Sequence, residues 1–249
     1  MLDGTSNDSW MLRLGSGAGV VGSLLAMVGN LLHPATPMGD PEGVARAIAQ
    51  SPAWVPVHLV IVVGLVLMLG GLVAISRSIG TGLAAALARM GLVAAVIGTA
   101  VGLVLVILDG VAAKHLAEAW ASAPAEEAPA ALRMVMAEET INFALASLFN
   151  ILFAGVTFVL YGLAVAWSDA YPRWAGWLVA VAGVGSVAVG LVQAYVGEPV
   201  PFTRAATIIF PTVITLWVAG MGLLLLRKEA AARTRSPLTS IGGEATRSP

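Results

Sequence analysis

The sequence predicts an all-α membrane protein, a polytopic bundle of six transmembrane helices. Hydrophobic residues make up 58% of the 249 positions and charged residues only 11%, whereas a soluble domain carries about 25% charged residues. Six apolar segments are each long enough to cross a bilayer core about 30 Å thick, which takes about 20 helical residues. Backbone groups in lipid must be hydrogen-bonded within their own segment, so we expect helices, and the alternating strands of a β-barrel do not occur.

The six segments are apolar on all sides, and we expect each to span the membrane. They are 11–32, 54–76, 87–108, 141–167, 174–196 and 203–226. The first shows no signal-peptide cleavage site, so we expect it to be retained. Short loops join the second to the third and the fourth to the fifth, which predicts antiparallel neighbours. The sixth contains Pro211, which lacks a backbone donor and is expected to kink the helix.

Close helix packing is predicted by small residues four apart, such as Gly15 and Gly19, because they let helix backbones approach each other in lipid. Trp217 lies in the middle of the sixth segment, and we expect it to pack against a neighbouring helix rather than at an interface.

The connections predict a helical hairpin on the outer side and a disordered tail. The stretch 109–140 reads as two helical arms, with Lys114 and Glu118 paired at i, i+4 and a break at 122–129. We expect the transmembrane domain to cover 1–228. The polar remainder, 229–249, predicts a disordered cytoplasmic tail.

The basic residues predict the orientation. With both termini inside, nine Lys and Arg residues flank the inner side and four the outer side, as the positive-inside rule requires. We therefore expect a multi-pass protein of a bacterial plasma membrane, with cytoplasmic N- and C-termini and the lipid bilayer as its first partner. The net charge of -1 is uninformative about nucleic acid, but no basic stripe suggests a nucleic-acid partner, and none is expected.

Three histidines, His33, His58 and His115, all fall near the predicted outer boundary. Neutral imidazole is a common ligand for zinc, copper and haem iron, and carboxylates could complete such a site. No tight motif such as H-x-x-x-H accompanies them, so interfacial histidines with a structural role are the competing interpretation. No cofactor is predicted outright, and haem or a transition metal stays the alternative.

A second group consists of polar residues at or within the ends of the apolar segments, all in the predicted outer half. Its members are Asp109, Glu139, Asn142, Asn150, Gln193, Glu198 and Arg204. Such residues usually face a bundle interior or a wet cavity, which predicts an outward-opening polar pocket for a small ligand, a lipid or an ion. Hydrogen bonding between helices is the alternative explanation. For Asp109 we expect a cation such as Arg204 or Lys114, a donor such as Asn142 or Gln193, or a proton.

Several phrases of the sequence resemble a family of six-helix bacterial membrane proteins of actinobacterial type whose function is uncharacterised. They are "GNLLHP", "WVPVHL", "LDGVAAKHLAEAW", "EETINFALASLFNILFAGVTFVLYGLAVA" and "YPRWAGW". The resemblance covers all six segments and implies a membrane location, but it implies no activity and no functional residue.

Three functional hypotheses follow. The first is a non-enzymatic protein that binds a small ligand, lipid or ion for transport or sensing, and the second is a membrane metal or haem protein. The third is a structural subunit, as a homo-oligomer or within a larger membrane complex. An enzyme is not expected, because the sequence contains no P-loop, H-E-x-x-H, G-x-S-x-G or Rossmann pattern.

Overall fold

The computed structural model describes residues 4–197 and 200–235, and within these ranges the chain is helical and contains no strand. Six stretches in these ranges are long and apolar enough to cross a membrane. They are Ser9–Leu32, Trp54–Ser78, Gly82–Ser122, Ala128–Ala166, Arg173–Val196 and Pro201–Ala231. The all-α class and the six membrane-spanning helices of a multi-pass membrane protein are therefore confirmed.

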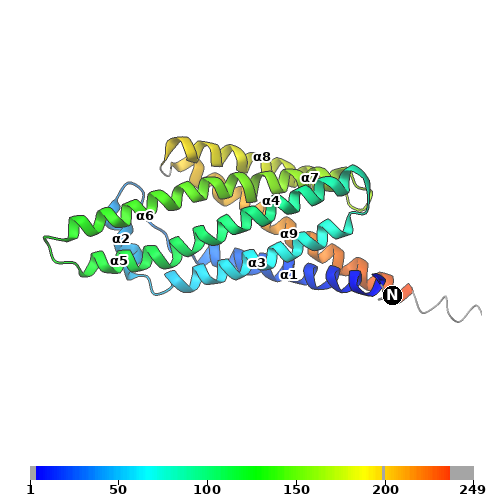
Figure 1. Ribbon diagram of the computed structural model, residues 1–249, viewed down its shortest axis with the longest axis horizontal. Coiled ribbons are helices and arrows are strands. Elements are labelled where there is room, and N and C mark those ends of the chain that lie inside the picture. Colours follow the sequence, from blue (N-terminus) through cyan, green and yellow to red (C-terminus); the bar gives the residue numbers. More distant parts are fainter. Residues whose placement is uncertain (1–3, 198–199, 236–249) are drawn as a thin grey trace, which may run out of the picture.

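The long helices form one elongated bundle (Figure 1). They are α1 (Gly4–Leu32), α3 (Trp54–Ser78), α4 (Gly82–Ile107), α6 (Ala128–Phe149) with its continuation α7 (Phe158–Ala166), α8 (Arg173–Val196) and α9 (Pro201–Arg235). Helix α3 packs on α1 and α4, α4 on α6 and α7, α7 on α8, and α8 on α9, which returns to α1. The six spans thus close into a ring.

Small residues bring the helix backbones together where the sequence predicts it. A methyl group added at Gly19 of α1 would lie 2.8 Å from the Cα of Gly71 in α3, and one added at Gly15 would lie 2.7 Å from the carbonyl oxygen of Gly70. Both distances are shorter than any side chain tolerates, so glycine is required at this crossing.

The centre of the bundle is filled by apolar side chains with two internal hydrogen bonds. The Tyr161 hydroxyl donates to the Leu72 carbonyl oxygen at 2.8 Å, and the indole of Trp217 donates to that of Ala175, also at 2.8 Å. Trp217 also meets Phe158 edge to face, with ring centroids 6.0 Å apart. The expectation that Trp217 packs against a neighbouring helix is confirmed.

One end of the bundle carries additional short helices, and we call it the α2–α5 end. Helix α4 continues through the π-helix η1 (Leu108–Ala112) into α5 (Ala113–Ser122), the chain turns, and α6 returns beside α5 (Figure 1). The short helix α2 (Pro41–Gln50) packs against α5 and α6. It begins where the Asp40 side chain accepts a hydrogen bond from the Gly43 amide at 2.9 Å, which caps its first turn.

The other end of the bundle corrects the predicted start of the tail. Helix α9 continues without a break through Arg235, so the chain is still helical after Glu229, where we expected disorder to begin. The stretch "EAAARTR" is rich in strong helix formers, which explains the extension. Glu229 also pairs with Arg13 of α1 at 3.6 Å. The rest of the predicted tail, 236–249, lies outside the described residues.

Candidate metal centre

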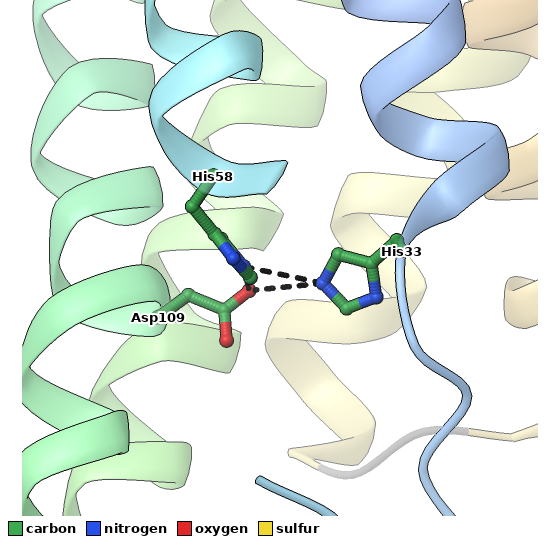
Figure 2. Close-up of side chains that lie close together, drawn as sticks. All are labelled: His33, His58 and Asp109. Carbon is green, nitrogen blue, oxygen red and sulfur yellow. Dashed lines mark hydrogen bonds and ion pairs between the residues drawn. The ribbon is translucent and has the colours of Figure 1, made fainter. Parts of the chain in front are cut away.

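Three side chains from different elements converge at the α2–α5 end. His33 directly follows α1, His58 lies just over one turn into α3, and Asp109 lies in η1. The His58 Nε2 atom lies 3.2 Å from the His33 Nε2 atom and 3.1 Å from the Asp109 Oδ2 atom, and the His33 Nε2 atom lies 3.9 Å from that oxygen (Figure 2). One ligand atom from each residue therefore falls within 4.8 Å of the others.

The second nitrogen of each imidazole determines what the converging atoms can do. His58 Nδ1 lies 2.6 Å from the Trp54 carbonyl oxygen, and His33 Nδ1 lies 2.9 Å from the Pro34 carbonyl oxygen. A carbonyl oxygen only accepts, so Nδ1 carries the hydrogen in both rings and Nε2 of the neutral ring carries a lone pair. When both rings are neutral, two lone pairs and a carboxylate oxygen face one another, and a shared cation, either a metal ion or a proton, would hold these three acceptors together.

The spacing of these atoms fits a small metal ion. Zinc bonds imidazole nitrogen and carboxylate oxygen at about 2.0–2.2 Å in tetrahedral sites, which places neighbouring ligand atoms about 3.3 Å apart. The contacts of 3.1 and 3.2 Å match that separation, and the third contact, at 3.9 Å, is slightly longer. Imidazoles that donate their other nitrogen to a backbone carbonyl are the usual form of metal-bound histidine.

The three residues differ in their access to the surroundings. His58 is almost fully buried, whereas the side chains of His33 and Asp109 remain 31% and 27% exposed. The centre is therefore closed on the α3 side, at His58, and open on the side of His33 and Asp109. An ion held there would keep a coordination position for water or another ligand.

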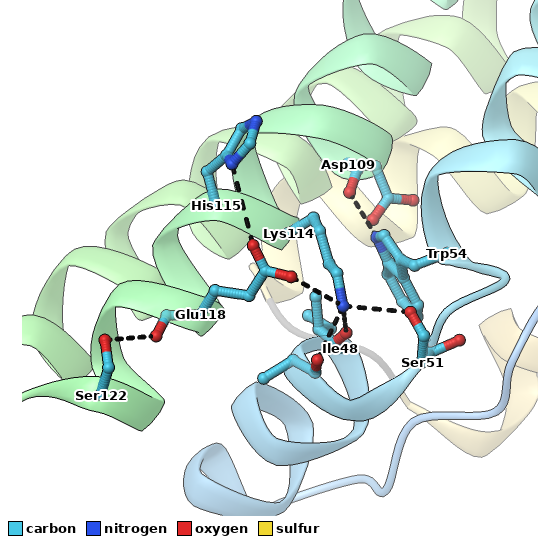
Figure 3. A network of polar contacts seen from close by, with 9 residues as sticks. Ile48, Ser51, Trp54, Asp109, Lys114, His115, Glu118 and Ser122 are labelled. Carbon is cyan, nitrogen blue, oxygen red and sulfur yellow. Dashed lines mark hydrogen bonds and ion pairs between the residues drawn. The ribbon is translucent and has the colours of Figure 1, made fainter.

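Trp54 links the three elements. Its indole donates to the Asp109 carbonyl oxygen at 2.7 Å (Figure 3). Its ring lies 5.0 Å from the ring of His33 and 5.1 Å from that of His58, measured between centroids. The side chain is only 1% exposed. Its role in positioning the centre was not predicted from the sequence.

The π-helix η1 brings Asp109 to His58. A methyl group added at Gly110 would lie 2.4 Å from the Cβ atom of His58, so the backbone of η1 rests directly on the base of the His58 side chain. A π-helical turn widens the helix locally and is frequently found at functional sites. Here it reorients Asp109 relative to the rest of α4.

Two further carboxylates, Glu138 and Glu139, lie on α6, which packs against η1. Glu139 interacts electrostatically with both Asp109 and His33, and Glu138 with Asp109 and Glu139. Glu138 is buried and Glu139 is partly exposed. Both lie near the centre, but neither is one of the three side chains whose ligand atoms converge there.

The cationic partners expected for Asp109 are wrong. Lys114 donates instead to the carbonyl oxygens of Ile48, Ala49 and Ser51 at the end of α2, and pairs with Glu118 at 3.2 Å as its spacing predicts (Figure 3). The side chain points from α5 towards α2, where the unpaired carbonyls of a helix C-terminus attract a positive charge. Arg204 is exposed on α9. The side chains that approach the Asp109 carboxylate are instead those of His33 and His58.

The remaining predicted site residues lie elsewhere. Asn150 and Gln193 form a buried hydrogen bond of 2.8 Å between η2 (Asn150–Thr157) and α8, which is the helix-to-helix role weighed for the polar group. Asn142 is buried on α6. His115 is 76% exposed and approaches only Glu118, at 3.9 Å (Figure 3). Glu198 lies outside the described residues.

Comparisons with known proteins add no assignment. No family model matches the chain, and neither a curated protein nor a solved structure shows significant similarity to it. The resemblance to an actinobacterial membrane family therefore stays a prediction.

Proposed function

We propose that this chain is a multi-pass protein of a bacterial plasma membrane that binds one divalent transition-metal ion through His33, His58 and Asp109. The observation that carries the proposal is the convergence of two lone-pair nitrogens and a carboxylate oxygen, with both Nδ1 atoms occupied by backbone carbonyls. Two imidazoles and one carboxylate suit zinc and its first-row neighbours better than calcium or magnesium, which prefer oxygen.

The arrangement favours a bare ion over haem. A porphyrin plane could not fit between imidazole nitrogens only 3.2 Å apart. The arrangement of the two imidazoles also favours the metal-binding hypothesis over a purely structural role for the histidines. A structural pair of neutral histidines would place a donor against an acceptor, whereas the only N–H of each neutral ring is already donated to the Trp54 or Pro34 carbonyl oxygen.

The positive-inside count supports the orientation that we propose, with both termini cytoplasmic. The metal centre then lies at the outer end of the bundle, and its partly exposed His33 and Asp109 make it accessible from outside the cell. The protein would receive or hold metal ions at the outer membrane face, in keeping with the hypothesis of ion sensing or transport.

The test is zinc binding by the purified full-length protein in detergent. We expect one zinc ion per chain after dialysis, measured by elemental analysis. We also expect Co²⁺ to give the intense visible absorption of a low-symmetry site. His58→Gln and Asp109→Asn should each lower zinc affinity at least about tenfold, because each removes a bonding atom.

His115→Gln provides the matched control, since it removes an exposed histidine close by in the same fold. It should bind zinc like the wild type. Equal zinc binding by the wild type and His58→Gln, or a wild type that binds none, would overturn the proposal and leave the three residues as a hydrogen-bonded structural cluster. A Soret band in the purified protein would instead select haem.

A further inference from the structure

Helix α6 carries a second polar feature that the metal centre does not use. Glu138 and Asn142 lie one helical turn apart on the same face, and they are only 7% and 9% exposed. Within the described part of the chain, three of their oxygens have no hydrogen-bond partner, namely Oε1 and Oε2 of Glu138 and Oδ1 of Asn142. All three are acceptors when the carboxyl is ionised.

Such oxygens are expensive to leave unpaired. A buried carboxylate or amide without a partner loses its hydration and gains nothing in exchange. The same helical rod shows the alternative two turns further on, where Asn150 is fully engaged with Gln193 at 2.8 Å. Hydrogen bonding between helices therefore explains the Asn150 pair and does not explain Glu138 and Asn142.

The surroundings of these oxygens are negative. Glu138 interacts electrostatically with Glu139 and with Asp109, and within the described residues it forms no ion pair with a Lys or Arg. Helix α6 packs against η1, which carries Asp109. A cation or a proton at this position would relieve the repulsion among these acidic groups.

We propose that Glu138 and Asn142 form a second cation site, one that takes a hard cation such as Na⁺ through oxygen ligands alone. Oxygen donors without nitrogen or sulfur select hard cations, whereas the imidazoles of the metal centre select transition metals. The site begins at Glu138, next to Glu139, and extends one helical turn along α6 to Asn142. It is an addition to the proposed transition-metal centre and does not depend on zinc binding there.

The competing explanation is a proton on Glu138 that bonds to Asn142, and one experiment separates the two. Thermal unfolding of the full-length protein in detergent is followed in choline chloride at constant ionic strength. Choline is then replaced by Na⁺, K⁺, Mg²⁺ or Ca²⁺, each in turn. We expect at least one of these ions to give a saturable rise in Tm, on the order of 5 °C at 100 times its Kd.

Glu138→Gln should abolish that rise, and Asn142→Ala should weaken it at least about tenfold in Kd, since one oxygen of three is lost. Glu126→Gln, at an exposed position before α6, is the matched control and should respond like the wild type. Zinc stoichiometry of Glu138→Gln, measured in parallel, should equal that of the wild type, which keeps the two sites distinguishable.

Two results would overturn the proposal. One is a wild type that none of the four ions stabilises, which would assign a proton to Glu138. The other is a rise in Tm that Glu138→Gln and Asn142→Ala both retain in full, which would place the ion elsewhere. If Glu138→Gln does not fold, the response of Asn142→Ala alone decides between these outcomes.

Discussion

Replacing Gly110 by alanine should disrupt the metal centre without removing any of its ligands. The added Cβ atom would lie 2.4 Å from the Cβ atom and 2.7 Å from the Cγ atom of His58, whereas ordinary contacts begin at 3.4 Å. The backbone of η1 must therefore move away from α3 by about 1 Å, and Asp109 is the adjacent residue. Metal–ligand distances tolerate deviations of only about 0.2 Å.

From this displacement we expect two effects. Overpacking a buried contact costs about 1–3 kcal/mol of unfolding free energy. Zinc affinity should fall at least about tenfold, equivalent to about 1.4 kcal/mol, because the carboxylate no longer reaches the ion held by His58. Titration calorimetry with zinc and thermal unfolding in the same detergent measure both quantities.

The control is Gly220→Ala in α9, where an added methyl group would meet no atom within 4 Å. Alanine there should leave zinc binding unchanged and alter stability by no more than about 1 kcal/mol, in the direction of higher helix propensity. Wild-type zinc affinity in Gly110→Ala would refute the positioning role of η1. If Gly110→Ala also had the stability of the wild type, the close contact between Gly110 and His58 would itself be refuted.

Three further outcomes are expected. Lys114→Met removes the cation that holds three carbonyl oxygens at the end of α2. Amide hydrogen exchange in Pro41–Gln50 should therefore accelerate, and the free energy of unfolding should fall by about 1–3 kcal/mol. Unchanged exchange would show that α2 is held by apolar packing alone. A double-mutant cycle of Asn150→Leu and Gln193→Leu should give a coupling energy of about 0.5–1.5 kcal/mol, and additive effects would contradict the buried bond. A C-terminal reporter active only outside the cytoplasm should stay silent, and strong activity would reverse the proposed orientation.

Much of the fold could be predicted because membrane segments are recognised by length and composition. A stretch of about 20 apolar residues can satisfy its backbone only as a helix in lipid, so each span follows from local sequence without knowledge of its neighbours. The error at the end of α9 has the same origin. Local polarity suggested disorder after Glu229, but the helix propensity of the alanine-rich stretch and the contact with Arg13 extend the helix to Arg235.

Counting along the spans also placed His33, His58 and Asp109 near one end of the bundle. It could not show that these three meet while His115 does not, because that depends on how each helix is rotated about its axis. This rotation is set by the packing of one helix on another. Here it is set by the glycine contacts between α1 and α3 and by the contact of the η1 backbone with His58. The π-helical turn is itself a departure from the regular period on which sequence reasoning relies.

The sequence by itself therefore determined the class of the protein, the number of its spans and the depth of its polar residues, because these depend on one segment at a time. Only the tertiary structure decided which polar residues become partners. It assigned Lys114 to the carbonyls of α2 and paired Asn150 with Gln193. It also brought one ligand atom each of two imidazoles and a carboxylate to within 4.8 Å of one another. The physical reason is that a side-chain cluster forms between helices, and the geometry between helices is a property of their packing.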